Sequence, residues 1–180
     1  MGFRRVDSEE QWSGHFIAVR RESFEHDDGE TVTREVVTHP GAVAIVCHDG
    51  ERLYLVSQPR EAAGEQALLE LPAGKLDEEG EDAEATARRE LAEEIGKGAR
   101  EWRHLKTFYT TPGFSDEQCH IYLATDLYDE DAEADENERI EIETVPLERI
   151  DDAIERSADA KTLIGLLWFK AYEQGGRAAG

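Results

Sequence analysis

The sequence predicts an α/β protein, in which helices cover a mixed β-sheet and an antiparallel β arm stands at the N-terminus. Two observations support this prediction. Strand-like segments, one helix, further strands and further helices follow one another along the chain, an order typical of a mixed sheet with helices packed on it. A hairpin pattern precedes the first strongly apolar strand. With 180 residues, the chain has about the length of one domain and can bury a sizeable core.

The hairpin pattern consists of two β-prone segments around a turn. Residues 15–24 and 31–37 are rich in apolar and β-branched side chains, and residues 26–29 (HDDG) have the composition of a turn. We therefore expect residues 1–40 to form a β arm and residues 41–174 to form the main domain. Residues 175–180 are expected to be a frayed tail.

Two strands and a helix form the expected centre of the main domain. Residues 41–48 (GAVAIVCH) and 52–58 (RLYLVSQ) flank an Asp-Gly turn, so they predict a central hairpin that is buried on at least one face. In residues 82–95, an apolar residue recurs at every fourth position, which predicts a helix with one buried stripe.

The remaining elements are shorter. Strands are expected at residues 104–109, 118–127 and 140–145, and helices at residues 147–156 and 161–173. The buried side of the last helix is expected to consist of Leu163, Leu166, Leu167 and Phe169.

The composition limits the partners of the protein. There are 42 acidic and 20 basic residues, giving a formal net charge of −22, which repels phosphate backbones and attracts divalent cations. We therefore expect no nucleic-acid partner. No segment has the length and apolarity of a membrane span or of a secretory signal, so we expect a soluble, cytoplasmic protein with no membrane partner. In a reducing compartment, Cys47 and Cys119 are expected to be buried free thiols.

Three carboxylates on the first predicted helix suggest a metal site. Glu90, Glu93 and Glu94 stand at positions i, i+3 and i+4, so their side chains project from one side of the helix. A hard cation such as Mg²⁺ prefers carboxylate oxygens and would relieve their mutual repulsion. The alternative is a solvated acidic helix face, which is common in a chain this acidic. Residues 70–76 (ELPAGKL) favour the metal site, because a strand that ends in a glycine loop can place a backbone carbonyl beside the helix.

Residues 74–97 resemble the Nudix box, in which a glycine, a glutamate and the motif R-E-U-x-E-E-x-G-U stand at set spacings, U being aliphatic. Two positions depart from the pattern: six residues instead of five separate Gly74 from Glu81, and the final aliphatic position is Lys97. The motif on the helix itself is intact. The matching residues are Glu81, Arg89, Glu90, Leu91, Glu93, Glu94 and Gly96.

The resemblance implies a Nudix-type α/β/α sandwich and a hydrolase that uses Mg²⁺, or else Mn²⁺. It implies that Glu90 and Glu94 bind the metal, that Glu93 contributes to metal binding and catalysis, and that the carbonyl of Ala73 completes the site. Arg89 and Glu81 are expected to pair with each other and to hold the loop on the helix.

Further segments resemble one branch of this family, the ADP-ribose pyrophosphatases. The resemblance implies hydrolysis of ADP-ribose to AMP and ribose 5-phosphate. Arg34, Arg60 and Glu70 stand in matching segments, and Pro112 lies 16 residues beyond Gly96, a spacing typical of the branch. These four residues are the candidates for substrate binding. An aromatic platform for adenine is also implied, with Phe16, Phe24 and Phe114 as candidates.

The resemblance also places a general base in a late acidic loop, where Glu136 and Glu138 are the candidates, and it implies a homodimer formed through the arm. Two other functions stay open at this stage. The chain is then either a Nudix hydrolase of another nucleotide sugar or nucleoside diphosphate derivative, or a Nudix module that binds a nucleotide without cleaving it.

Overall fold

The structure is a computed structural model that describes residues 2–132 and 139–174. It divides into two compact units. The first consists of Met1–Gly41 together with Phe108–Gln118, and the second of Ala42–Thr107 and Cys119–Gly180. None of the helices in the described ranges combines the length and the apolar character needed to cross a bilayer.

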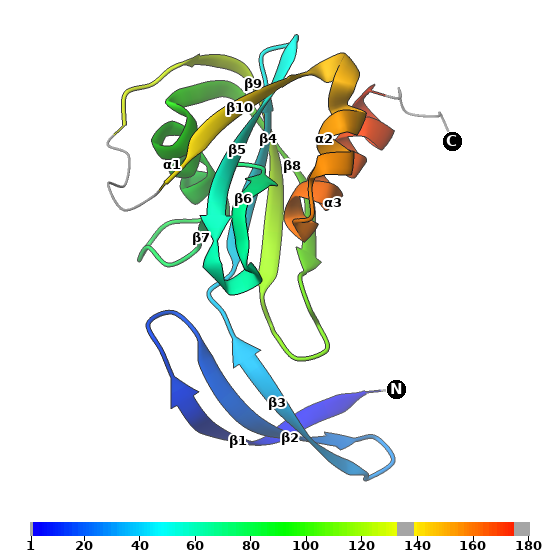
Figure 1. The fold of residues 1–180 in the computed structure, drawn as a ribbon. Coiled ribbons are helices and arrows are strands. Elements are labelled where there is room, and N and C mark those ends of the chain that lie inside the picture. Colours follow the sequence, from blue (N-terminus) through cyan, green and yellow to red (C-terminus); the bar gives the residue numbers. More distant parts are fainter. Residues whose placement is uncertain (1, 133–138, 175–180) are drawn as a thin grey trace. The chain divides into compact units, whose positions relative to one another are not determined.

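The first unit is a three-stranded antiparallel sheet (Figure 1). Its strands are β1 (Phe3–Ser13), β2 (Ala18–His26) and β3 (Thr31–Thr38), with β2 in the middle. The hairpin of β2 and β3 confirms the prediction, whereas β1 was not predicted from the polar sequence of residues 3–13. Its ladder with β2 explains why it forms, because backbone hydrogen bonds stabilise a strand whose side chains are mostly exposed.

The loop of residues 108–118 belongs to this first unit. The amide of Val37, in β3, donates to the carbonyl of Phe114 at 2.7 Å, and the amide of Asp116 donates back to the carbonyl of Val37 at 3.2 Å. The carboxylate of Asp116 also accepts a hydrogen bond of 2.9 Å from the amide of His39. These contacts, which join residues far apart in the sequence, attach the loop to the end of β3.

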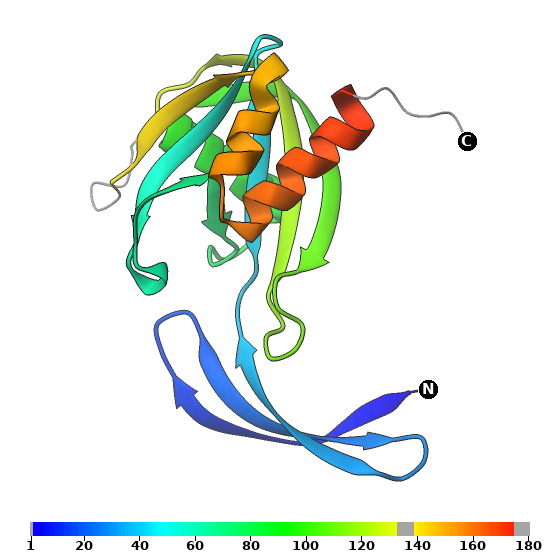
Figure 2. The same ribbon diagram turned by 45° about the vertical axis from the view of Figure 1, so that its right-hand side comes forward.

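The second unit is a seven-stranded mixed sheet with helices on both faces. Five strands lie in the order β10-β5-β4-β9-β8, while β6 pairs with β5 and β7 pairs with β4. Figures 1 and 2 show α1 on one side of the sheet and α2 and α3 on the other. This is the α/β/α arrangement that was predicted.

The strands are β4 (Ala42–His48), β5 (Arg52–Arg60), β6 (Glu65–Glu70), β7 (Ala73–Lys75), β8 (Lys97–Tyr109), β9 (Gln118–Asp129) and β10 (Glu141–Pro146). The helices are α1 (Ala83–Ile95), α2 (Ile150–Arg156), α3 (Ala160–Phe169), the short η1 (Glu61–Ala63) and η2 (Leu147–Arg149), and the π-helical η3 (Lys170–Gln174).

Strand β4 is the centre of the core because helices pack on both of its faces. Val43, Ile45 and Cys47 share one buried cluster with the apolar stripe of α1, whereas Val46 faces Gly165 of α3. Side chains alternate between the faces of a strand, so a strand covered on both sides must be apolar at nearly every position. This explains the apolar run of residues 41–48.

Two sequence predictions need correction here. The predicted hairpin of β4 and β5 pairs only near its turn, at Cys47–Tyr54 and His48–Leu53, because β7 pairs with Ala42–Ala44 on β4. The other edge of β4 pairs in parallel with β9. In α3, Leu166 and Phe169 are buried as expected, but Leu167 is 51% exposed because it lies on the outer side of the helix. The two cysteines are buried and are not joined in a disulfide, as predicted.

Candidate active site

Helix α1, which carries the three carboxylates, is fixed at both of its ends. Its first turn is capped by Asp82, whose carboxylate accepts a hydrogen bond of 2.8 Å from the amide of Ala85. Its last turn closes at Gly96, which has the left-handed conformation, with φ of 69°, that glycine adopts most easily. Ala87, Leu91 and Ile95 bury the apolar stripe in the core. The acidic residues are therefore carried by a rigid element.

The carboxylates do not form a freely solvated face, which was the alternative interpretation. Glu94 is only 7% exposed, and the side chains of Glu90 and Glu93 are 12% and 32% exposed. Glu94 is close enough to the buried thiol of Cys47 for its negative charge to add to the effect of burial, which raises the pKa of that thiol. Carboxylates buried to this extent need partners that offset their charge.

Arg89 supplies part of that compensation. Its Nη1 donates to Glu90 Oε1 at 2.9 Å and to Glu93 Oε2 at 2.8 Å, while its Nε donates to both oxygens of Glu81 at 3.3 Å. Burial opposes the charge of Arg89, but the surrounding carboxylates outweigh it, so that the pKa of Arg89 is raised. The expected pair of Arg89 and Glu81 is therefore present, and the same guanidinium also donates hydrogen bonds to two of the three helix carboxylates.

The strand β7 lies directly against the acidic face of α1. The amide of Ala73 donates to Glu94 Oε2 at 3.0 Å. A Cβ atom built on Gly74 would lie 1.9 Å from Glu90 Oε1, a distance at which the two atoms would overlap. Any other residue at position 74 would displace the Glu90 side chain from this place, which favours a glycine at this point of the motif. The extra residue between Gly74 and Glu81 lies in the loop before α1 and leaves these contacts in place.

A second cluster surrounds Arg60 at the end of β5. Arg60 Nε and Nη2 donate to the two oxygens of Glu70 at 2.6 and 2.9 Å, and Lys161 of α3 donates to the same carboxylate. The hydrogen bond to Glu70 raises the pKa of Arg60 against the effect of burial, and the charges of Glu94 and Asp159 add to it. Arg60 is therefore within electrostatic range of the acidic face of α1.

Comparison with known proteins identifies the family. Residues 37–165 match the model of the NUDIX domain. The chain belongs to the Nudix family. An ADP-ribose pyrophosphatase of Bacillus subtilis is 38% identical over 94% of both chains. An ADP-ribose pyrophosphatase of Mycobacterium tuberculosis is 47% identical over 69% of this chain and 60% of its own length. A crystal structure titled ADP compounds hydrolase matches with a TM-score of 0.84 and 25% identity, and covers 99% of this chain and 98% of its own.

As a Nudix hydrolase, the chain is a divalent-metal-dependent enzyme. The residues around α1 fit such an ion chemically, because they offer carboxylate oxygens on a rigid helix and a glycine that leaves room for Glu90. Within the described ranges, no three acidic, histidine or cysteine side chains already meet in metal-binding geometry. Arg89 and the amide of Ala73 donate hydrogen bonds to these carboxylates, and each carboxylate keeps further lone pairs with which it can bind an ion.

The other predicted site residues fall into three groups. Arg34 and Pro112 line one surface cavity of about 530 Å³ in the first unit, and Phe24 and Phe114 line it too. Phe16 contributes a different contact, packing edge-on against the ring of His39. Glu136 and Glu138, the candidates for the general base, lie outside the described residues.

Sequence reasoning included Glu70 among the site residues but missed Lys161, which binds Glu70, and Asp159, which binds Lys161. Lys161 is separated from Glu70 by 91 positions, and no local pattern links the two. The signal that was available is weaker: Asp159 precedes an apolar helix, where a capping residue is expected, and its carboxylate does accept a hydrogen bond from the amide of Thr162 at 2.9 Å.

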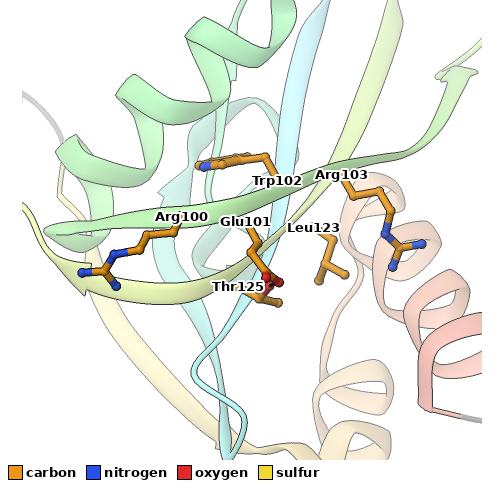
Figure 3. A pocket seen from close by; sticks show the side chains of 6 residues that line it. All are labelled: Arg100, Glu101, Trp102, Arg103, Leu123 and Thr125. Atoms are coloured by element: carbon orange, nitrogen blue, oxygen red, sulfur yellow. Dashed lines mark hydrogen bonds between the residues drawn. The ribbon is translucent and has the colours of Figure 1, made fainter.

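A further hollow, of about 470 Å³, lies on strands β8 and β9 (Figure 3). Arg100 and Arg103 extend to opposite sides of it, and Glu101 accepts a hydrogen bond of 3.1 Å from Thr125. Polar groups that converge on a ligand are typical of binding sites. The two arginines diverge here, so we assign no function to this hollow.

Proposed function

We propose that the protein hydrolyses ADP-ribose to AMP and ribose 5-phosphate with the help of Mg²⁺. The observation that carries this proposal is the similarity to the Bacillus subtilis ADP-ribose pyrophosphatase, because it covers 94% of both chains. It therefore includes the segments around Arg34, Arg60 and Pro112 as well as the Nudix box, and these segments are the ones that favour this substrate.

The proposed reaction needs residues that bind the metal and a residue that acts as general base. Glu90, Glu93, Glu94 and the carbonyl of Ala73 would hold the metal, with Mn²⁺ as the alternative to Mg²⁺. A divalent ion, when bound, neutralises phosphate charge, polarises a phosphoryl oxygen and activates water. Glu136 or Glu138 acts as the general base, and Glu93 is the further candidate for a catalytic role.

Substrate binding depends on arginine because the protein carries a net charge of −22 and the substrate is itself an anion. Arg60 binds the diphosphate from beside the acidic face. Arg34 and Pro112 are the further candidates for substrate recognition; they line a cavity of the first unit together with two phenylalanines. Glu70 contributes to substrate binding together with Arg60, with which it forms two hydrogen bonds.

We also propose a cytoplasmic homodimer whose N-terminal β arm, residues 1–40, forms the interface, with residues 41–174 as the Nudix domain. Exposed aromatic side chains on and around this arm support the interface, and two cysteines that form no disulfide support a reducing compartment. The charge of the protein supports the absence of a nucleic-acid partner.

A substrate panel tests the proposal. ADP-ribose, other nucleotide sugars, dinucleotides and nucleoside triphosphates are incubated with Mg²⁺, with Mn²⁺ or with a chelator, and the products are identified. Preferential conversion of ADP-ribose to AMP and ribose 5-phosphate, lost with chelator, is the expected result. Cleavage of another diphosphate would make the protein a Nudix hydrolase of that compound, and binding without cleavage would make it a sensing module.

The role of Arg60 has its own test. Arg60→Ala is expected to raise KM about tenfold or more and to lower kcat much less, because the arginine contacts the diphosphate in both the ground state and the transition state. Steady-state kinetics of the wild type and the variant check this. An unchanged KM would remove Arg60 from the substrate site.

A further inference from the structure

The guanidinium of Arg60 is held on its buried side by Glu70. Glu70 binds it side-on through Nε and Nη2, with distances of 2.6 and 2.9 Å, and this arrangement leaves Nη1 on the side away from Glu70. The side chain of Arg60 is 41% exposed, whereas that of Glu70 is completely buried. Glu70 therefore lies on the buried side of Arg60, and the solvent-accessible edge of the pair belongs to the guanidinium of Arg60.

The carboxylate of Glu70 needs an anchor of its own. Its terminal torsion is soft, so a carboxylate bound by a single partner can turn and carry that partner with it. Lys161 prevents this, because its ammonium donates to Oε2, the oxygen that also accepts from Arg60 Nη2. Lys161 is held in turn by Asp159 at 3.0 Å.

The first turn of α3 and the segment before it also form hydrogen bonds with the two neighbours of Glu70 in the chain. The hydroxyl of Thr162 accepts from the amide of Leu71 at 2.8 Å, and the hydroxyl of Ser157 donates to the carbonyl of Leu69 at 3.1 Å. Leu71 is thus bound to the first turn of α3, and Leu69 to Ser157 at the end of α2, with one backbone contact on each side of Glu70. The anchor lies in the second unit, as do Arg60 and the acidic face of α1.

We propose that Lys161 is a positioning residue for substrate binding: by anchoring Glu70, it holds Arg60 with its outer edge directed to the diphosphate of the substrate. This inference rests on the proposed function of Arg60. It assigns a role in the reaction to the first turn of α3, which carries none of the residues of the Nudix box. In the same proposal, Glu70 affects substrate binding indirectly, by holding Arg60 in position.

A double-mutant cycle tests the proposal. Lys161→Met removes the ammonium and keeps the apolar stem. It is expected to raise KM roughly fivefold to tenfold with kcat within about twofold, the size typical of a coupling between contacting residues. In the Arg60→Ala background, the same substitution is expected to change KM by less than about twofold, because the residue through which Lys161 acts is gone. Lys161→Arg, which keeps a cationic donor, is expected to restore most of the binding.

Lys170→Met is the matched control. Lys170 is an exposed lysine in η3 that pairs with Asp151, so its substitution changes the net charge equally without touching Glu70. Its kinetic constants are expected to equal those of the wild type. Thermal unfolding shows whether each variant is folded, and Lys161→Gln takes the place of the methionine variant if the latter is not.

The outcomes are separable. An unchanged KM in Lys161→Met, or an equal rise in KM with and without Arg60, would overturn the positioning role, because Lys161 would then act on stability or elsewhere. The wild-type substrate panel comes first, and the cycle uses the diphosphate that the wild type cleaves best. Failure to cleave ADP-ribose would thus overturn the proposed function alone.

Discussion

The strands of the first unit and the central strand of the second bury their side chains to very different extents. In β1, ten of the 11 positions are exposed and one is half-buried, whereas Val43 to Cys47 of β4 are all completely buried. The buried residue of the described first-unit strands is charged: Glu22, at 5% exposure, accepts hydrogen bonds from Arg5 at 2.8 Å and Ser8 at 3.0 Å.

The difference shows that each unit is stabilised internally by a different kind of interaction. Apolar burial stabilises the second unit, including α1, because the apolar stripe of this helix is part of that core. The first unit depends on backbone ladders and cross-strand ion pairs, and a small sheet of this kind gains stability when its apolar side chains are covered. Phe3, Trp12 and Phe114, which are 67%, 54% and 57% exposed, are available for such a cover.

The largest expected effect tests this contrast directly. Ile45→Ala should lower the free energy of unfolding by about 2–5 kcal/mol, because it leaves a cavity in the core of the second unit. Val6→Ala, on a β1 side chain that is 40% exposed, should change it by about 0.5 kcal/mol or less. Denaturant unfolding of both variants measures these values, and equal costs would contradict the contrast.

The next effect concerns the acidic face of α1. Glu94→Gln should lower kcat/KM about a hundredfold or more while the midpoint of thermal unfolding changes little, since glutamine keeps the size of the side chain and an oxygen that accepts from Ala73. Steady-state kinetics at several Mg²⁺ concentrations check this. Turnover at the wild-type rate would remove Glu94 from the metal site.

Gly74 offers a test of the fit between β7 and α1. Gly74→Ala should lower kcat/KM roughly tenfold to a hundredfold, because the new methyl group displaces the carboxylate of Glu90 from its place. Titration with Mn²⁺ should show weaker metal binding in the same variant. If metal affinity and activity were both unchanged, the contact with Glu90 would have no part in catalysis.

The smallest effect concerns the surface of the first unit. Sedimentation should give a particle of twice the 20.3 kDa mass of the chain, and Phe3→Ser should weaken that association about tenfold. Ile142→Ser is the matched control, because Ile142 is 51% exposed in the second unit and its loss should leave the association unchanged. A monomeric wild type would contradict the proposed dimer.

Several features could be predicted because they depend on neighbours in the sequence. The helix expected at residues 82–95 is observed as Ala83–Ile95, with its cap at Asp82 and its end at Gly96, because capping and apolar periodicity are local signals. The hairpin of β2 and β3 was predicted from its turn. The strand β1 was not, because its polar side chains carry no alternation and its ladder with β2 decides its conformation.

The sequence by itself determined the α/β class, helix α1 and the membership of the Nudix family, since each depends on the order of elements along the chain or on residues a few positions apart. Only the tertiary structure decided that Arg89 ties Glu90 and Glu93, that Gly74 lies against Glu90, and that Lys161 lies behind Arg60. The physical reason is that a buried charge must find its partner in space, and packing of the sheet against α3 brings Lys161 to Glu70 across 91 positions of the chain.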